Sequence, residues 1–154
     1  MIQSNLRFKS FTKFSAELLE DILQLEAKVF PKPYSKEILE REMKSKSSLF
    51  GILVYDGDRP VAYKIGFEHS VSIFYSWIGG VHPEYRRQSI ARKLIRLQHE
   101  WCKKTGFEKV RTSSENEFRE MLILNLREGF DIIGTYVSGR ANGPTIMFEK
   151  NLKA

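Results

Sequence analysis

One short segment of the chain combines the residue types and the spacing that phosphate binding requires. An apolar run ends at residue 81, and after a short loop a helical pattern begins near residue 89. The first N–H groups of a helix have no partner inside the helix and lie at the positive end of its dipole, so such a turn binds phosphate through backbone donors. Arg86, Arg87 and Arg92 add full positive charges, which predicts a pyrophosphate ligand. The candidate residues for this ligand are Gly79, Gly80, Val81, Arg86, Arg87, Gln88, Ser89, Ile90, Ala91 and Arg92.

The positive charge of the chain is concentrated in the same region. The net charge is +6, from 25 Lys and Arg against 19 Asp and Glu, and residues 86–111 hold nine basic and two acidic side chains. That segment carries +7, so the rest of the chain sums to −1. A domain that coats nucleic acid spreads its charge or adds a basic tail, and it places exposed aromatic residues among the basic ones. Trp101 instead belongs to the apolar stripe of its helix, so the pattern favours a local anion site over nucleic-acid binding.

Apolar periodicity along the chain shows which elements position this turn. Helical periods predict helices over residues 15–30, 35–44, 89–105 and 116–128. Alternating or continuous apolar runs predict strands over residues 2–10, 49–55, 61–67, 71–78, 107–112, 130–137 and 145–152. Turns are expected at 56–60 and 68–70, and the pair Gly79-Gly80 indicates a bulge or a close approach of another group. The order β-α-α-β-β-β-α-β-α-β-β predicts one mixed α/β domain over residues 1–154.

Residues 81–91 resemble the pyrophosphate loop of the GNAT superfamily of acetyl-CoA-dependent N-acetyltransferases. The pattern of that family is Gln/Arg-x-x-Gly-x-Gly/Ala after a Val-x-Pro, and Arg86 takes its first position and Ala91 its last. Ser89 replaces the glycine, whose missing Cβ lets backbone approach phosphate closely. A serine keeps much of that freedom, can cap the helix and offers a hydroxyl donor. We therefore expect somewhat weaker CoA binding and not its loss.

The order of the elements resembles that of the same family over nearly the whole chain. The resemblance implies an α+β domain with a twisted, mostly antiparallel mixed sheet of about six or seven strands and about four helices. It also implies an acyltransferase. The acetyl group would pass directly from acetyl-CoA to a primary amine of a small molecule or of a peptide or protein N-terminus.

The resemblance assigns the steps of the transfer to particular residues. The backbone N–H of Val81, exposed by an irregularity at Gly79-Gly80, would stabilise the oxyanion. The position of the tyrosine that usually protonates the thiolate holds Asn125, which is expected to contact CoA and cannot supply a proton. A thiol with a pKa of ~8.5 can leave as a thiolate near neutral pH. We therefore expect the lack of a proton donor to slow the reaction without preventing it. Glu68, Tyr75 and Ser76 are the candidates for taking the amine proton.

Structural roles stay open for the same side chains. The arginines at 86, 87 and 92 can form a solvated helix start, Asn125 can be a satisfied polar group of the core, and Tyr75 can pack on the sheet. A CoA-binding module of the same fold without efficient turnover is the alternative function. The residues that motivate it are Ser89 and Asn125.

Several classes of protein are disfavoured by composition. The single cysteine, Cys102, cannot form an internal disulfide, and the three histidines have no metal-ligand spacing. No run of eighteen apolar residues and no apolar leader is present. We therefore expect a cytoplasmic monomer or homodimer that uses no metal, nucleic acid or membrane. His82 and His99 are expected at the surface.

Overall fold

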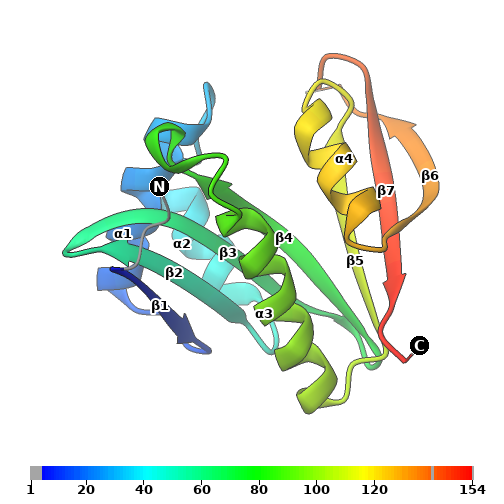
Figure 1. Ribbon diagram of the computed structural model, residues 1–154, viewed down its shortest axis with the longest axis horizontal. Helices are drawn as coiled ribbons and strands as arrows, with labels where there is room; N and C mark the ends of the chain where they lie inside the picture. Colours follow the sequence, from blue (N-terminus) through cyan, green and yellow to red (C-terminus); the bar gives the residue numbers. More distant parts are fainter. Residues whose placement is uncertain (1–4, 140, 154) are drawn as a thin grey trace.

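The computed structural model describes residues 5–139 and 141–153, and in them seven strands form one sheet flanked by helices (Figure 1). The elements are β1 (Leu6–Phe11), α1 (Ala16–Val29), α2 (Lys36–Ser45), β2 (Phe50–Asp56), β3 (Arg59–Ser70), β4 (Ile73–Val81), the 3-10 turn η1 (Pro83–Tyr85), α3 (Ile90–Thr105), β5 (Lys109–Glu115), α4 (Arg119–Arg127), β6 (Asp131–Val137) and β7 (Pro144–Asn151). Apart from the short turn η1, this order confirms the one predicted from periodicity.

The sheet has the order β1-β2-β3-β4-β5-β7-β6 and contains one parallel pair, β4 with β5. This pair is short: it runs from Ile73 opposite Lys109 to Ser76 opposite Thr112. Beyond Ser76 the two strands diverge, which Figure 1 shows as a V that opens toward the end of β4. Among the described residues, therefore, no strand pairs with β4 after Ser76 on the edge that faces β5.

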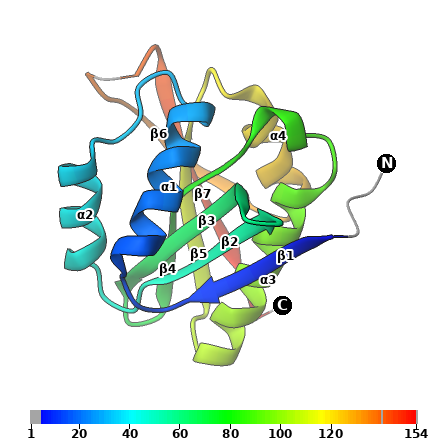
Figure 2. The ribbon, with the colours of Figure 1, turned by 90° about the vertical axis from the view of Figure 1, so that its left-hand side faces the viewer.

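Two apolar layers lie on opposite faces of the sheet, with α1 and α2 on one face and α3 and α4 on the other (Figure 2). Successive side chains of a strand point to opposite faces. Along β2, Ile52 and Val54 accordingly join the core under α3, whereas Leu53 and Tyr55 join the core under α1 and α2. No helix among the described residues is long and apolar enough to cross a membrane.

Helix ends follow the local signals in the sequence. The hydroxyl of Ser15 accepts a bond of 3.2 Å from the Leu18 N–H, and Ser35 accepts one of 3.2 Å from the Ile38 N–H. Such caps satisfy N–H groups that the first turn of a helix leaves unpaired. Gly106 ends α3 with a φ of 103°, a conformation that glycine adopts without strain.

Two local predictions were wrong. Residues 68–70 belong to β3, and the turn that follows consists of Val71 and Ser72, because Ser70 pairs with Ile73. The irregularity in β4 falls at Trp77, between the pairs Ser76–Gly66 and Ile78–Ile65, and not at Gly79-Gly80, which pair regularly. The predicted first strand is confirmed over residues 6–10, where β1 forms an edge of the sheet; residues 2–4 of its predicted range lie outside the described residues.

Candidate active site

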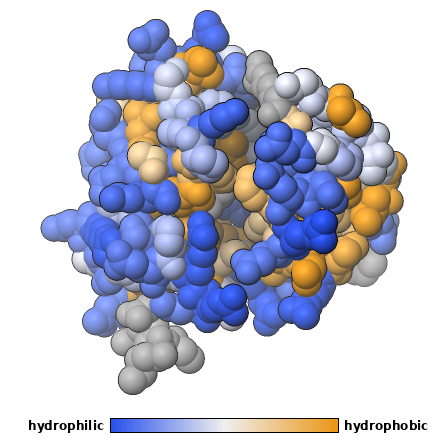
Figure 3. Space-filling model, turned by 90° about the horizontal axis from the view of Figure 1, so that it is seen from above, coloured by the Kyte–Doolittle hydropathy of each residue, from blue (hydrophilic) through white to orange (hydrophobic). Residues whose placement is uncertain are grey.

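Two backbone donors of β4 face the space between the diverging strands. The N–H of His82 donates to the carbonyl of Val61 on β3 at 2.8 Å. Because alternate residues of a strand send their N–H groups to opposite edges, those of Val81 and Gly79 point away from β3, toward the side on which β5 lies. Figure 3 looks down on this end of the molecule and shows the surface hollowed there, with hydrophobic residues on the walls. The N–H groups of Gly79 and Val81 thus point into this hollow from β4.

The loop between β4 and α3 has the backbone of an anion-binding turn. Arg87 and Ser89 both adopt a φ of 63°, in the left-handed region that favours glycine. Alternation of left-handed and ordinary residues turns successive N–H groups toward one point and forms a concave anion site. The loop leads directly into α3, whose positive end adds to the attraction for phosphate. Ser89 holds the N-cap position, but its hydroxyl makes no capping bond, which corrects the expected capping role.

We expect Ser89→Gly to raise the affinity for acetyl-CoA severalfold. The glycine adopts a φ of 63° without strain and removes the Cβ from the path of the phosphates. Stability should change by no more than about 1 kcal/mol, because relief of strain is offset by the greater entropy of the unfolded chain. Calorimetry with acetyl-CoA measures the effect. Ser48→Gly is the matched control, since Ser48 also has a positive φ, of 50°, and lies before β2; equal affinity gains in both variants would contradict the prediction.

A buried network anchors the loop to the turn between β2 and β3. The hydroxyl of Tyr85 donates to Asp56, and an Arg59 nitrogen lies 3.1 Å from His82 Nε2. His82 Nδ1 accepts from the Glu84 N–H at 3.1 Å. His82 is therefore buried and not at the surface as expected, and its burial, followed by the charge of Arg59, lowers its pKa. The neutral ring of His82 can then accept the hydrogen bond from the Glu84 N–H, and this bond fixes the position of the loop.

The three predicted arginines have different surroundings. Arg86 donates through Nε to the Val81 carbonyl at 3.1 Å and holds the end of β4. Arg92 lies 3.5 Å from the buried Glu128 carboxylate, which also receives a 2.9 Å bond from Arg96. Arg87 is 90% exposed and approaches only Glu120, at 3.9 Å, among the described residues. Arg92 is thus paired with a buried carboxylate, whereas the charges of Arg86 and Arg87, both exposed, remain available to a phosphate, and Arg87 makes the fewest contacts of its own.

The remaining predicted residues lie at different places. Tyr75 donates to Ser113 Oγ at 3.1 Å, and the buried Asn125 donates to Ser114 Oγ at 3.5 Å. The two therefore reach neighbouring residues of β5. Glu68 accepts from Ser48 Oγ at 3.3 Å and lies six positions along β3 from the residue that pairs with Val81, roughly 20 Å away. The structure does not bring Glu68 to the cleft beside Val81.

An aromatic cluster on the α1–α2 face was missed by the sequence analysis. The rings of Tyr34 and Phe67 lie 6.0 and 5.9 Å from that of Trp77, and Phe67 lies 5.6 Å from Tyr75. Trp77 is the extra residue of the β4 bulge and packs on that face. The ammonium of Lys46 lies 4.6 Å from the Phe67 ring centre, so the cluster already holds one cation against an aromatic face. Its position beside the cleft suits an amine acceptor.

The buried carboxylate of Glu26 fixes the loop that carries Tyr34. It accepts from the Tyr34 backbone N–H at 3.2 Å and from the hydroxyl of Tyr63. Burial and the adjacent carboxylate raise the pKa of Tyr63 well above its usual range, so this hydroxyl stays protonated as the donor. The described residues include no group of three His, Cys, Asp or Glu that could hold a metal ion.

Comparison with known proteins agrees with this geometry. A family model, the acetyltransferase (GNAT) domain, matches residues 13–117. The fold is similar to the ribosomal-protein-S18-alanine N-acetyltransferase from Escherichia coli, with a TM-score of 0.82 and 14% identity over 97% of this chain and 95% of that one. It is also similar to NAA60 from Arabidopsis thaliana in complex with acetyl-CoA, with a TM-score of 0.78 and 14% identity over 97% and 99% of the two chains.

A third similar structure is the spermidine/spermine N-acetyltransferase SpeG from Vibrio cholerae, with a TM-score of 0.72 and 15% identity over 97% of this chain and 94% of that one. No curated protein matches the chain in sequence. The family model spans well over half of the chain, and the diverging strands and the phosphate-binding loop lie within its matched range. The chain therefore belongs to the GNAT acetyltransferase family and is an acyltransferase.

Proposed function

We propose that the protein transfers an acetyl group from acetyl-CoA directly to a primary amine of a small molecule or of a protein N-terminus. The observation that carries this proposal is the cleft between β4 and β5 with an anion-binding loop at its open end. The N–H groups of Arg87, Gln88 and Ser89, together with the Arg87 side chain, would hold the pyrophosphate. The exposed edge of β4 would hold the pantetheine arm, as a neighbouring strand would.

The residues of the cleft provide for attack of the amine on the thioester. The N–H groups of Gly79 and Val81 lie on the same edge of β4, about 7 Å apart, so one of them would stabilise the negative charge that develops on the carbonyl oxygen and the other would pair with the pantetheine arm. As the new C–N bond forms, the C–S bond breaks and CoA leaves as a thiolate. Asn125 can donate a hydrogen bond from its amide but no proton, and a thiolate with a conjugate-acid pKa of ~8.5 can leave without one. Tyr75, whose hydroxyl donates to Ser113, lies six residues from Val81 along β4, roughly 20 Å away, so like Glu68 it is too far from Val81 to take the amine proton, and we assign that proton to water.

Two of the predicted bases, Glu68 and Tyr75, lie six residues along their strands from the level of Val81, which favours acceptors whose amine is easily deprotonated. An α-amino group has a pKa of about 7.7–8.0, whereas that of a lysine is about 10.4. Near neutral pH the α-amine is neutral to a much greater extent and needs less help to become a nucleophile. One similar structure is named for acting on an alanine of a ribosomal protein and another for acting on spermidine and spermine. We therefore propose α-amines as the first class of acceptor to test.

The alternative is a protein of the same fold that binds CoA without efficient turnover. Asn125 in place of a proton donor and Ser89 in place of glycine favour it. Calorimetry with acetyl-CoA and measurement of CoA release with short peptides, amino acids and polyamines separate the two. We expect binding, and CoA release with α-amines well above the hydrolysis rate. Binding without release for any acceptor would support the alternative, and no binding at millimolar acetyl-CoA would overturn both.

A further inference from the structure

Three buried polar side chains, two on α3 and one on β4, have no hydrogen-bond partner among the described residues. They are Ser76, Gln98 and His99, which are 3%, 1% and 5% exposed. The unpartnered atoms are the Ser76 hydroxyl, both amide atoms of Gln98 and both ring nitrogens of His99. An unpaired buried polar group costs about 1–3 kcal/mol, and native proteins carry few of them. Several in one layer therefore indicate a site that a polar ligand completes.

Ser76 and Gln98 stand at the same level of the molecule. The ring of Phe74 on β4 lies 5.5 Å from that of Trp101 on α3. From that contact, Ser76 lies two residues farther along β4, and Gln98 lies about one turn back along α3. Since α3 runs opposite to β4, both displacements go in the same direction (Figure 1). Ser76 is also the last residue of β4 that pairs with β5, so these groups lie at the closed end of the cleft.

Lys64 brings a positive charge to the stretch of β4 between Ser76 and the open end of the cleft. It lies on β3 opposite Gly79, and a Cβ on Gly79 would lie only 3.4 Å from Lys64 Cγ. The lysine stem therefore passes beside the glycine that leaves β4 bare. Lys64 has no ion pair among the described residues. Burial lowers its pKa to about 8, with no acidic group opposing the effect.

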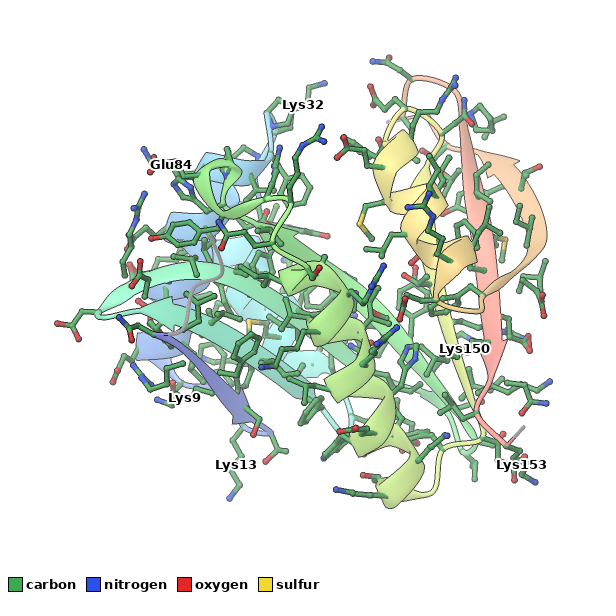
Figure 4. All side chains as sticks on the ribbon, in the orientation of Figure 1. Lys9, Lys13, Lys32, Glu84, Lys150 and Lys153 are labelled. Carbon is green, nitrogen blue, oxygen red and sulfur yellow. The ribbon has the colours of Figure 1, made fainter. Side chains whose placement is uncertain are left out.

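The surroundings of His99 are also positive. Burial, followed by the charges of Lys150, Lys64 and Lys103, lowers the pKa of His99 to about 3, so the ring is neutral and can donate one N–H. Lys150 lies on β7 beside the end of α4 (Figure 4), within reach of Gly129. The nearby carboxylate of Glu128 is already bonded to Arg92 and Arg96. The cluster thus offers hydrogen-bond donors and positive charge with no carboxylate of its own.

We propose that Lys64, Ser76, Gln98 and His99 form an acyl subsite that binds a carboxylate at the far end of the acyl chain. The protein would then use acyl-CoA donors of the succinyl type as well as acetyl-CoA, and bind them more tightly. This inference rests on the proposed binding of a CoA thioester between β4 and β5. A thioester laid along β4 from the phosphate loop toward Ser76 carries its acyl group to this end. In the transfer the amine gains the acyl carbon and loses a proton, the C–S bond breaks, CoA takes up a proton, and the distal carboxylate stays unchanged.

Calorimetry with CoA, acetyl-CoA and succinyl-CoA tests the proposal in the wild type and in Lys64→Met. A charge-assisted hydrogen bond in a partly buried site corresponds to about tenfold or more in affinity. We expect succinyl-CoA to bind the wild type at least about tenfold more tightly than acetyl-CoA. Lys64→Met should abolish that difference and leave the affinity for acetyl-CoA nearly unchanged. Lys104→Met is the matched control, since Lys104 is an exposed lysine in the last turn of α3, and it should keep the preference.

A second variant keeps the test independent of the behaviour of Lys64→Met. Gln98→Leu replaces an unpartnered amide by an apolar side chain of similar size, so it should fold at least as stably as the wild type and reduce the preference for succinyl-CoA. Equal affinities for both thioesters in the wild type would overturn this inference and leave the proposed function standing. So would a preference that survives both substitutions. If none of the three ligands binds, the proposed function fails together with it.

Discussion

Replacing Arg87 by glutamate is expected to lower the affinity for acetyl-CoA by at least about tenfold without changing the free energy of unfolding. A hydrogen bond to a charged group contributes about 1.5–3 kcal/mol, and the substitution also places a negative charge beside the phosphates. The fold itself makes little use of this side chain, because it is 90% exposed and 3.9 Å from an equally exposed Glu120. Ion pairs of that kind contribute little to stability.

Lys104→Glu is the matched control for this prediction. It changes the net charge by the same amount within the same basic segment, but it lies at the far end of α3. That position is roughly 25 Å from the loop along the helix axis. Calorimetry in buffers of equal ionic strength should show reduced affinity in Arg87→Glu alone. A similar loss in both variants would mean that the whole basic segment, and not the loop, attracts the ligand.

Gly66→Ala is expected to lower the free energy of unfolding by about 2–3 kcal/mol, in the range of overpacked cores. A Cβ at this position would lie 2.5 Å from the Tyr75 carbonyl oxygen and 2.3 Å from the Phe74 ring. The backbone oxygen cannot rotate away, so β3 and β4 must move apart. Gly66 pairs with Ser76 directly beside the bulge at Trp77, so the same movement should displace Trp77 from the aromatic cluster.

Urea unfolding followed by tryptophan fluorescence measures both effects. Gly139→Ala is the control, since Gly139 has no heavy atom within 4 Å of an added Cβ, and it should stay within about 0.5 kcal/mol of the wild type. We also expect the emission of native Gly66→Ala to shift, because Trp77 becomes more exposed to water. A stability of Gly66→Ala equal to that of Gly139→Ala would refute the packing argument.

The features that could be predicted from the sequence are those whose cause is local. Ser15 and Ser35 cap helices through contacts three residues away, and Gly106 ends α3 by its own conformation. The phosphate-binding loop is of the same kind, because a strand end, a basic turn and a helix start follow one another within about a dozen residues. From these signals together we could predict where the phosphate-binding loop lies in the fold. The family could be predicted from that position.

The features that could not be predicted depend on partners far away in the chain. Burial of His82 requires Arg59, which belongs to the preceding hairpin. Arg92 pairs with Glu128, 36 residues farther on, so its charge could not be separated from that of Arg87 by inspection. The bulge at Trp77 depends on the register between β3 and β4, which the sequence does not reveal. The sequence analysis therefore placed the irregularity at the neighbouring glycines. That Ser76, Gln98 and His99 have no hydrogen-bond partner in the described part of the chain is visible only once the packing of α3 is known.

The short pairing of β4 with β5 has a consequence for how the molecule responds to a ligand. In the described part of the chain, strand pairing joins the first four strands to the last three through four residue pairs. A molecule that lies along β4 takes the place of the missing stretch of neighbouring strand, and it contacts both sides of the seam. Its binding energy therefore also fastens the two parts of the sheet to each other, so that occupancy of the site and rigidity of the whole fold rise together.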